Sequence, residues 1–420
     1  MTLTFISRSG AVAGQPNAHE LRGASGRLLF DCGAGPRGAS YIATMHRPTA
    51  VWISHAHHDH CGGLFELLAS WPRTTVLATA TTAKLLKFAL SKGGAKGGRG
   101  TSRVEALVRR VVVVPWQRFR AVPKMEGVKI MALPAGHVPG AAMAVVDWDD
   151  GGQRRRVLYT GDFCTHDQAV VKGGGIPRID QGPSMDAVIC EAMLANDREA
   201  DEVVWEEEAR RLVQCVHSSR GPVVVGVGAI GESLEVATLL ARAGVEVMID
   251  DYLQGVFEVC RHKVESEWRR WKFGDRRRMR GHLRAGGVVV ATGDQYRRTT
   301  TAGVLADQVV EDRRATIVVL NRAREQTGAG RLLASEMGGQ MKWSGRNVNR
   351  LATVVHCQLI NHAPRWQLEG FIGGVAAGKT LLVHGPTGSR WGLKRALKKK
   401  GYAGEVEVVE RGERYVIGGR

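Results

Sequence analysis

Short apolar runs, each closed by glycines or polar residues, recur along the first half of the chain. Runs of this kind are typical of buried strands. They predict strands at residues 27–30, 51–54, 76–77, 111–114, 128–133 and 187–190. Two further runs, at residues 145–148 and 156–159, flank a turn of aspartates and glycines and predict a hairpin. Helical periodicity lies between the runs, at residues 64–70 and 81–90.

The middle of the chain alternates strands with amphipathic helices. The pattern predicts helices at residues 202–218 and 233–242 and strands at residues 222–226, 245–249, 287–291 and 316–320. Such alternation is typical of a parallel α/β unit. Towards the C-terminus we expect strands at residues 352–355, 381–383 and 405–409, and helices at residues 365–372 and 390–400. The whole is predicted to be an α/β protein, and its 420 residues suit two domains.

Composition narrows the setting in which the chain works. No apolar stretch is long enough to cross a membrane, and we expect no signal peptide. The seven cysteines are scattered and form no C-x-x-C pair. This pattern argues against a disulfide framework and a cysteine zinc site, and it favours a reducing, cytoplasmic location.

The charge of the chain is strongly basic. It carries 59 lysines and arginines against 41 acidic residues, a net charge of +18. The excess favours a polyanionic partner, although it could serve solubility alone. Residues 261–284 concentrate it, with ten basic and three acidic residues among aromatic ones. This segment is a candidate nucleic-acid track, or else a charged helix exposed to solvent. The arginines that we expect to contact nucleic acid there are Arg269, Arg270, Arg276, Arg277, Arg278 and Arg280.

A cluster of metal-binding side chains follows the predicted strand at residues 51–54. His55, His57, Asp59 and His60 lie within six positions, where the strand gives way to a loop. Imidazole and carboxylate groups this close suit zinc. The alternate spacing of His55 and His57 puts both on one side of an extended segment. We expect His58 to point away. The alternative is a histidine-rich loop that binds nothing.

Four more candidates each follow a predicted strand or precede a helix. They are His137, Asp162, His362 and His384. Taken singly, each is compatible with an ordinary capped loop residue. Taken together, they are expected to converge, because α/β sheets place their sites at strand ends.

The ordered set Asp31, His55-x-His57-x-Asp59-His60, His137 and Asp162 resembles the motif series of the metallo-β-lactamase fold. Residues 54–64 and 135–142 are similar to those of its β-CASP branch, which includes the polyadenylation-complex endonuclease and ribonuclease J relatives. Three later motifs of that branch are matched in order by Glu191, His362 and His384-Gly385. Residues 291–298 and 327–332 match the branch only loosely, and residues 360–362 depart from its usual Ser-Ala-His.

The resemblance implies a four-layer αββα fold with an inserted parallel α/β domain. We expect the first part of the metallo-β-lactamase domain at residues 1–195, the β-CASP insertion at 196–350 and the C-terminal part at 351–420. We also expect no KH-like segment before this arrangement and no further domain after it.

The resemblance also implies a site for two zinc ions, with manganese or magnesium as options. One ion would be held by His55, His57 and His137, and the other by Asp59, His60 and His384, with Asp162 bridging them. A metal-activated water would then attack a phosphodiester. The catalytic residues would be Asp59, Glu191 and His362, of which His362 protonates the leaving oxygen and Glu191 orients it. Asp31 either holds the metal loop by hydrogen bonds or is a simple turn aspartate.

The implied activity is that of a ribonuclease acting on single-stranded RNA, by endo- or 5′-exonucleolytic cleavage, with a homodimer as one option. RNA is preferred because the RNA-acting members usually keep a histidine where His384 stands. Three alternatives remain: a DNA nuclease of the same family, a hydrolase of small esters or thioesters, and a catalytically silent RNA-binding scaffold.

Overall fold

The computed structural model describes residues 2–11, 15–91, 99–149, 152–177 and 184–418. Its chain separates into two units. Unit 1 comprises Met1–Asp167, Val171–Asp201 and Asn361–Arg420, and unit 2 comprises Gln168–Val170 and Glu202–Ile360.

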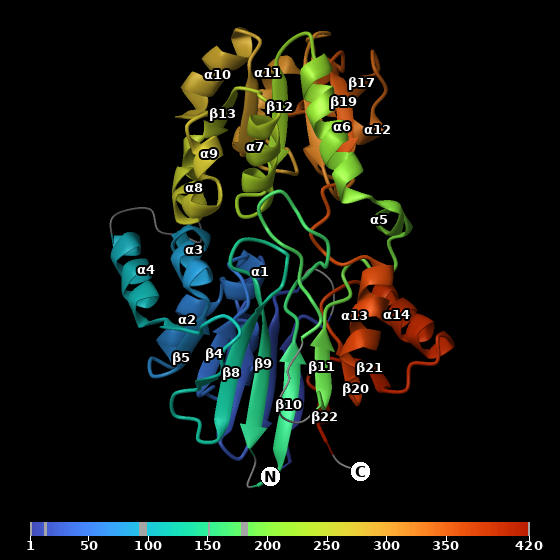
Figure 1. The fold of residues 1–420 in the computed structure, drawn as a ribbon. Helices are drawn as coiled ribbons and strands as arrows, with labels where there is room; N and C mark the ends of the chain where they lie inside the picture. Colours follow the sequence, from blue (N-terminus) through green and yellow to red (C-terminus); the bar gives the residue numbers. More distant parts are fainter. Residues whose placement is uncertain (1, 12–14, 92–98, 150–151, 178–183, 419–420) are drawn as a thin grey trace. The chain divides into compact units, whose positions relative to one another are not determined.

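Two seven-stranded sheets form the framework of unit 1 (Figure 1). The first has the order β22 (Arg414–Val416), β1 (Thr4–Ser9), β2 (Ala18–Gly23), β3 (Gly26–Phe30), β4 (Ala50–Ile53), β5 (Thr75–Ala78) and β6 (Val112–Val113). The second has the order β21 (Glu405–Val408), β20 (Lys379–Leu382), β11 (Ala187–Cys190), β10 (Arg154–Tyr159), β9 (Ala142–Asp149), β8 (Val128–Pro134) and β7 (Arg120–Ala121).

The two sheets share one hydrophobic core. Phe30 and Trp52 from the first sheet are fully buried in the same cluster as Ile130, Val146 and Leu381 from the second. Burying an aliphatic side chain of this size stabilises a fold by about 1.5–3 kcal/mol. The helices α2 (Leu64–Ser70), α3 (Ala80–Ser91) and α4 (Arg99–Arg110) lie on one side of the sandwich, and α13 (Arg365–Val375) and α14 (Thr387–Lys399) on the other (Figure 1). The predicted αββα layering is confirmed.

Unit 2 is built on one parallel sheet. Its order is β14 (Trp271–Gly274), β13 (Val247–Asp250), β15 (Val288–Thr292), β12 (Val223–Val227), β16 (Thr316–Leu320) and β19 (Thr353–Cys357), and all neighbours run parallel. A separate hairpin joins β17 (Gln340–Trp343) to β18 (Arg346–Asn349). The helices are α6 (Trp205–Ser218), α7 (Glu232–Arg242), α8 (Gln254–Cys260), α9 (Glu265–Trp268), α10 (Arg276–Arg284), α11 (Thr301–Val309) and α12 (Gly328–Ala334). The central strands are runs of valine and isoleucine, as expected of strands covered on both faces.

The boundary of unit 2 differs from the predicted insertion at residues 196–350. The strand expected at 352–355 lies in the sheet of unit 2, because β19 pairs with β16 over five residues from Thr316↔Thr353 to Leu320↔Cys357. Unit 2 therefore runs to Ile360. An apolar strand of four or five residues fits either sheet by pattern, and the pairing partner decides.

The helix expected at 202–218 is confirmed as α6, which begins three residues later, after the extended residue Val204. A separate short helix, α5 (Arg198–Glu202), precedes it. The basic segment 261–284 is not one helix, since it contains α9, β14 and α10. Strands β1 and β2 were not predicted. The hairpin of β9 and β10 is confirmed by its antiparallel pairing, but residues 150–151 of its turn lie outside the described residues. Among the described helices, none combines the length and the apolar character that crossing a lipid bilayer requires.

Candidate metal centre

The loop after β4 is held in place by a buried aspartate. Asp31 is fully buried and accepts hydrogen bonds from the Ser54 amide (2.7 Å), the Ser54 hydroxyl (2.8 Å) and the Tyr159 hydroxyl (2.6 Å). It also accepts one from His60 Nδ1 at 2.8 Å. A carboxylate behind an imidazole fixes the ring and leaves the other nitrogen free to bind a metal. These hydrogen bonds favour the first of the two roles considered for Asp31, that of holding the metal loop, over that of a simple turn aspartate.

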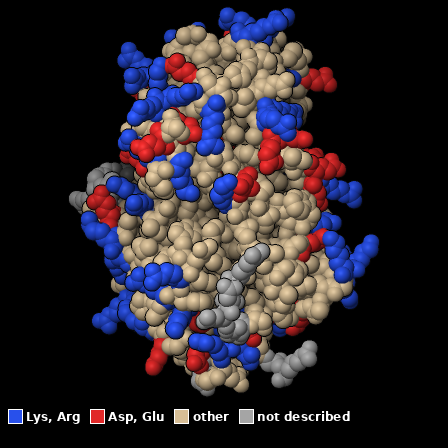
Figure 2. Space-filling view, viewed as in Figure 1, with Lys and Arg blue, Asp and Glu red and all other residues tan. Residues whose placement is uncertain are grey.

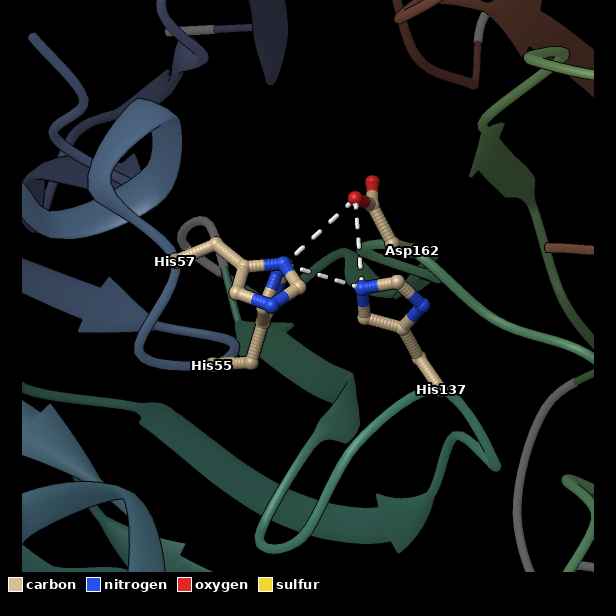
Figure 3. A group of neighbouring side chains, drawn as sticks. All are labelled: His55, His57, His137 and Asp162. Carbon is tan, nitrogen blue, oxygen red and sulfur yellow. Dashed lines mark hydrogen bonds and ion pairs between the residues drawn. The ribbon is translucent and has the colours of Figure 1, made fainter. Parts of the chain in front are cut away.

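The first group of candidate ligands joins the loop after β4 to the ends of two other strands. His55 and His57 follow β4, His137 follows β8 and Asp162 follows β10. Their ligand atoms all lie within 4.8 Å of one another. Figure 3 shows the three imidazoles and the carboxylate pointing toward one another. His137 Nε2 lies 3.1 Å from His57 Nδ1, and His55 Nε2 lies 3.7 Å from Asp162 Oδ2.

The second group consists of Asp59, His60 and His384. Asp59 and His60 lie on the one-turn helix α1 (His58–Cys61), and His384 follows β20. The Asp162 carboxylate adjoins this group as well, because Oδ2 lies 3.2 Å from His60 Nε2 and Oδ1 lies 3.5 Å from His384 Nε2. One carboxylate therefore lies beside both groups.

Glu191 and His362 form a third contact with Asp162. His362 Nδ1 donates to Glu191 Oε1 at 2.9 Å, while His362 Nε2 lies 3.9 Å from Asp162 Oδ2. Glu191 is buried and also accepts from the backbone amides of Phe163 and Met193, each at 3.0 Å. The carboxylate is thus fixed by the backbone, and it fixes the His362 ring in turn.

Burial and charge set the protonation of these groups. Burial, together with the neighbouring histidines, holds the pKa values of His55 and His137 well below the usual range. Both rings are therefore neutral at physiological pH, which metal binding requires. Burial would raise the pKa of Asp162, but His384, His60 and His362 outweigh it and hold that pKa well below its usual range. For His362, burial acts to lower the pKa, yet Glu191 and Asp162 raise it to about 9.

The donor set fits a metal. His55 Nε2 and Asp162 Oδ1 are buried and have no hydrogen-bond partner among the described residues. Buried polar atoms are nearly always satisfied, so two orphaned ligand atoms in one cluster point to an ion as their partner. Imidazole with carboxylate is a donor set for zinc, and it accommodates manganese as well.

The backbone of the site is strained in two places. Asp31 has a φ of 60° and His384 a φ of 33°, a region that non-glycine residues rarely adopt. Such strain costs about 1–3 kcal/mol per residue and persists where the surroundings enforce it. Close approach adds a further constraint, because a Cβ on Gly33 would lie 1.7 Å from the Asp59 carbonyl oxygen.

His58 is exposed and its Nδ1 donates to the Ala34 carbonyl at 3.1 Å. It belongs to none of the ligand groups among the described residues. The arginines of the candidate nucleic-acid track lie in unit 2 and are exposed, but two serve the fold: Arg270 donates to the Ala241 carbonyl and Arg276 to the Thr299 carbonyl.

The aromatic residues of the track do not offer a stacking surface. Trp271 is buried and donates to the Ala237 carbonyl at 3.2 Å. Trp268 and Phe273 pack against each other, with ring centroids 5.8 Å apart. Trp271 therefore cannot stack on a base, because its ring is buried within unit 2.

Sequence reasoning missed Asn17. It is fully buried, and its amide nitrogen lies 2.9 Å from both His60 Nε2 and His384 Nδ1. Its backbone amide also donates to the Asp59 carbonyl at 2.7 Å. No local sequence pattern marks Asn17. It is a single asparagine just before β2, a strand that was not predicted because its residues are mostly polar.

Comparison with known proteins shows which family part of the chain is similar to. Residues 11–178 match the model of the metallo-beta-lactamase superfamily. This part of the chain is therefore similar to the superfamily. A protein named as a ribonuclease from Thermus thermophilus is 26% identical over 242 residues, 54% of this chain and 52% of that protein. Cleavage and polyadenylation specificity factor 73 from Drosophila melanogaster is 25% identical over 230 residues, 51% of this chain and 32% of that protein. The predicted resemblance to the β-CASP branch is confirmed.

These matches leave much of each relative uncovered, since the chain spans about half of the Thermus protein and a third of the Drosophila one. A solved structure extends the likeness of fold. The crystal structure of a protein of unknown function from Enterococcus faecalis has a TM-score of 0.67 at 15% identity, covering 99% of this chain and 100% of that one.

Proposed function

We propose that this metallo-β-lactamase protein is a zinc-dependent ribonuclease that hydrolyses phosphodiester bonds in single-stranded RNA with a metal-activated water. The observation that carries the proposal is the position of Asp162, whose carboxylate oxygens lie within 3.9 Å of histidines from both ligand groups and of His362. A carboxylate so placed is suited to bridge two cations.

His55, His57 and His137 would hold one ion, and Asp59, His60 and His384 the other. Two adjacent divalent cations would supply an ionised water at neutral pH and stabilise charge on the phosphate. Asp31 holds His60 through Nδ1, and Asn17 holds His384 through Nδ1, so that the Nε2 atoms of both rings face Asp162. The chain's own residues thus provide the preorganised geometry that such chemistry needs.

His362 would donate the proton to the leaving oxygen. With a pKa of about 9, it is protonated at neutral pH, as a general acid must be. Glu191 holds the ring by the bond to Nδ1, which leaves Nε2 as the donor. This pairing resembles the base-orienter arrangement of other hydrolases, in which a buried carboxylate fixes the tautomer of a histidine.

RNA is preferred over DNA because His384 is the residue type kept by the RNA-acting members of the branch, and the names of the relatives agree with it. The net charge of +18 supports a polyanionic substrate over a small ester.

The test is a time course on single-stranded RNA labelled at the 5′ end and, separately, at the 3′ end. Mononucleotide release from one end would indicate an exonuclease, and internal fragments an endonuclease. His57→Ala should abolish cleavage, while His58→Ala, a matched control on an exposed ring outside the ligand groups, should retain it.

Bound metal is measured on the same preparations by elemental analysis. Equal cleavage of single-stranded DNA at matched salt would overturn the preference for RNA. Turnover of a small thioester without affinity for RNA would replace the proposal with a small-molecule hydrolase, and absence of bound metal would favour a silent scaffold.

A further inference from the structure

A hollow lies wholly within unit 2. It has a volume of about 490 Å³, in the range of pockets that hold small ligands. Three segments form it: the loop after β15, the segment from Arg324 through the start of α12, and the turn between β17 and β18. The first two include residues 296–298 and 327–331, which fall in the stretches that match the β-CASP branch only loosely.

The lining is strongly basic. It contains Arg297, Arg298, Arg324 and Arg331 and no carboxylate. None of the four arginines makes an ion pair with a carboxylate in the described part of the chain, whereas Arg314 and Arg346 of the same unit do pair. Guanidinium groups bind phosphate through parallel N–H donors, so four of them around one acid-free hollow favour an anion.

Hydrogen bonds hold the segments that line the hollow in place. The Tyr296 hydroxyl is buried, accepts from the Gly226 amide at 2.7 Å and donates to the Val318 carbonyl at 2.5 Å. Gln295 Oε1 accepts from the Arg324 amide and the Thr327 hydroxyl, at 3.0 and 3.1 Å, which ties the first two segments together.

One wall carries an unsatisfied donor. Trp343 lines the hollow and is 2% exposed, and its indole Nε1 has no hydrogen-bond partner among the described residues. The buried Trp343 ring belongs to the hydrophobic core of unit 2 and so forms a fixed part of the wall.

We infer that this hollow is a phosphate-binding site that holds one nucleotide unit, separate in sequence from the metal ligands. The phosphoryl group could belong to a free nucleotide or to the backbone of a single-stranded nucleic acid. In the second case the inference rests on the proposed function and makes the hollow an accessory site for the substrate.

The experiment compares the full chain with Arg298→Gln/Arg331→Gln. Both side chains are exposed, so folding should be unaffected, and a thermal melt verifies this. Arg220→Gln/Arg313→Gln is the matched control, with the same loss of charge at exposed positions of unit 2 outside the hollow. Gln326→Trp fills the hollow without removing charge. Uridine 5′-monophosphate is titrated by calorimetry, and a short single-stranded RNA by fluorescence anisotropy in a His57→Ala background.

The pocket variants should weaken binding by roughly tenfold or more, and the control should not. For RNA, the arginine pair should also lower the slope of log affinity against log salt by about 1.4, since each phosphate contact on a single strand contributes roughly 0.7. An effect on the nucleotide alone identifies a free nucleotide as occupant, and an effect on RNA alone identifies the strand.

Unchanged binding of both ligands in both pocket variants would overturn the inference. Neither binding measurement requires the ligand to be cleaved. A chain that cuts no RNA, but whose nucleotide binding depends on Arg298 and Arg331, would refute the proposed nuclease and leave the phosphate site standing.

Discussion

Single residues of the metal centre act through charge more than through contact area. Asp162 is 3% exposed and lies among histidines that would repel one another if protonated. Its negative charge stabilises the protonated form of His60, whose pKa is raised well above the usual range, despite burial, by Asp162, Asp59 and Asp31. Bound metal would replace that proton, because a ligand imidazole must be neutral. The same residues can thus balance charge with protons or with cations.

The substitution Glu191→Gln should change the pH dependence of activity. The glutamate raises the pKa of His362, so its neutral isostere should lower that pKa by about 1–3 units. A general acid works only while protonated, so activity lost at high pH should be lost at correspondingly lower pH in the variant. The measurement is the pH profile of kcat/KM on RNA. A reduced rate with an unmoved alkaline limb would show that Glu191 serves the fold and does not tune His362.

At the scale of elements, the site depends on how closely loops approach one another. The turn after β3 brings Gly33 against α1, where its amide donates to the Asn17 carbonyl at 2.9 Å. Any side chain at this position would enter the space of the Asp59 carbonyl. The second ligand group is therefore positioned by a backbone contact that only glycine permits.

Gly33→Ala should displace α1 and with it Asp59 and His60, so bound metal and activity should both fall. Gly35→Ala is the matched control, because its nearest neighbour to a Cβ, Pro16 Cδ, lies at an ordinary 3.4 Å. Elemental analysis and the cleavage assay are run on both variants, and circular dichroism verifies that each is folded. Full metal content in a folded Gly33→Ala protein would contradict the proposed constraint.

A buried ion pair joins the strands β9 and β10. Arg156 and Asp147 are 2% and 6% exposed, and the guanidinium donates to both carboxylate oxygens, at 2.5 and 2.9 Å. Asp147→Ala should destabilise unit 1 by about 3–5 kcal/mol, because it removes the carboxylate that two guanidinium nitrogens of a buried arginine contact. Urea unfolding measures the change. Glu207→Ala, which removes one member of an exposed pair with Arg210, should have little effect, and equal losses in both variants would refute the argument.

The elements also show where sequence reasoning succeeds. The strand at residues 187–190 is a continuous apolar run, and the strand at 128–133 is apolar except for Lys129. The ligand loop follows an apolar strand with alternate histidines, so these features could be predicted locally. Strand β2 could not. Its His19 and Glu20 are fully buried, and Glu20 is paired with Arg8 at 3.0 Å. The burial of this strand therefore could not be predicted from a pattern of hydrophobic residues. Asn17 and the arginine-lined hollow depend on residues that meet only in the folded chain.

The whole molecule carries a net charge of +18. Figure 2 shows basic side chains across the visible face with acidic ones between them. A general field of this kind attracts any polyanion. The question is whether particular arginines of the track add local contacts. Arg277, Arg278 and Arg280 on α10 are exposed, and none makes an ion pair within the described residues. Arg276, by contrast, donates a hydrogen bond to the Thr299 carbonyl.

Reversing Arg277, Arg278 and Arg280 to glutamate should lower the salt slope of RNA binding by about 2 if each contacts one phosphate. The control reverses Arg37, Arg47 and Arg73, three exposed arginines of unit 1, and so changes the net charge equally. Anisotropy titrations of single-stranded RNA at several salt concentrations give both slopes. A fall confined to the α10 variant locates phosphate contacts on that helix. Equal falls of the salt slope in both variants would mean that RNA responds only to the charge of the whole molecule. An unchanged slope in the α10 variant would show that the track does not bind RNA.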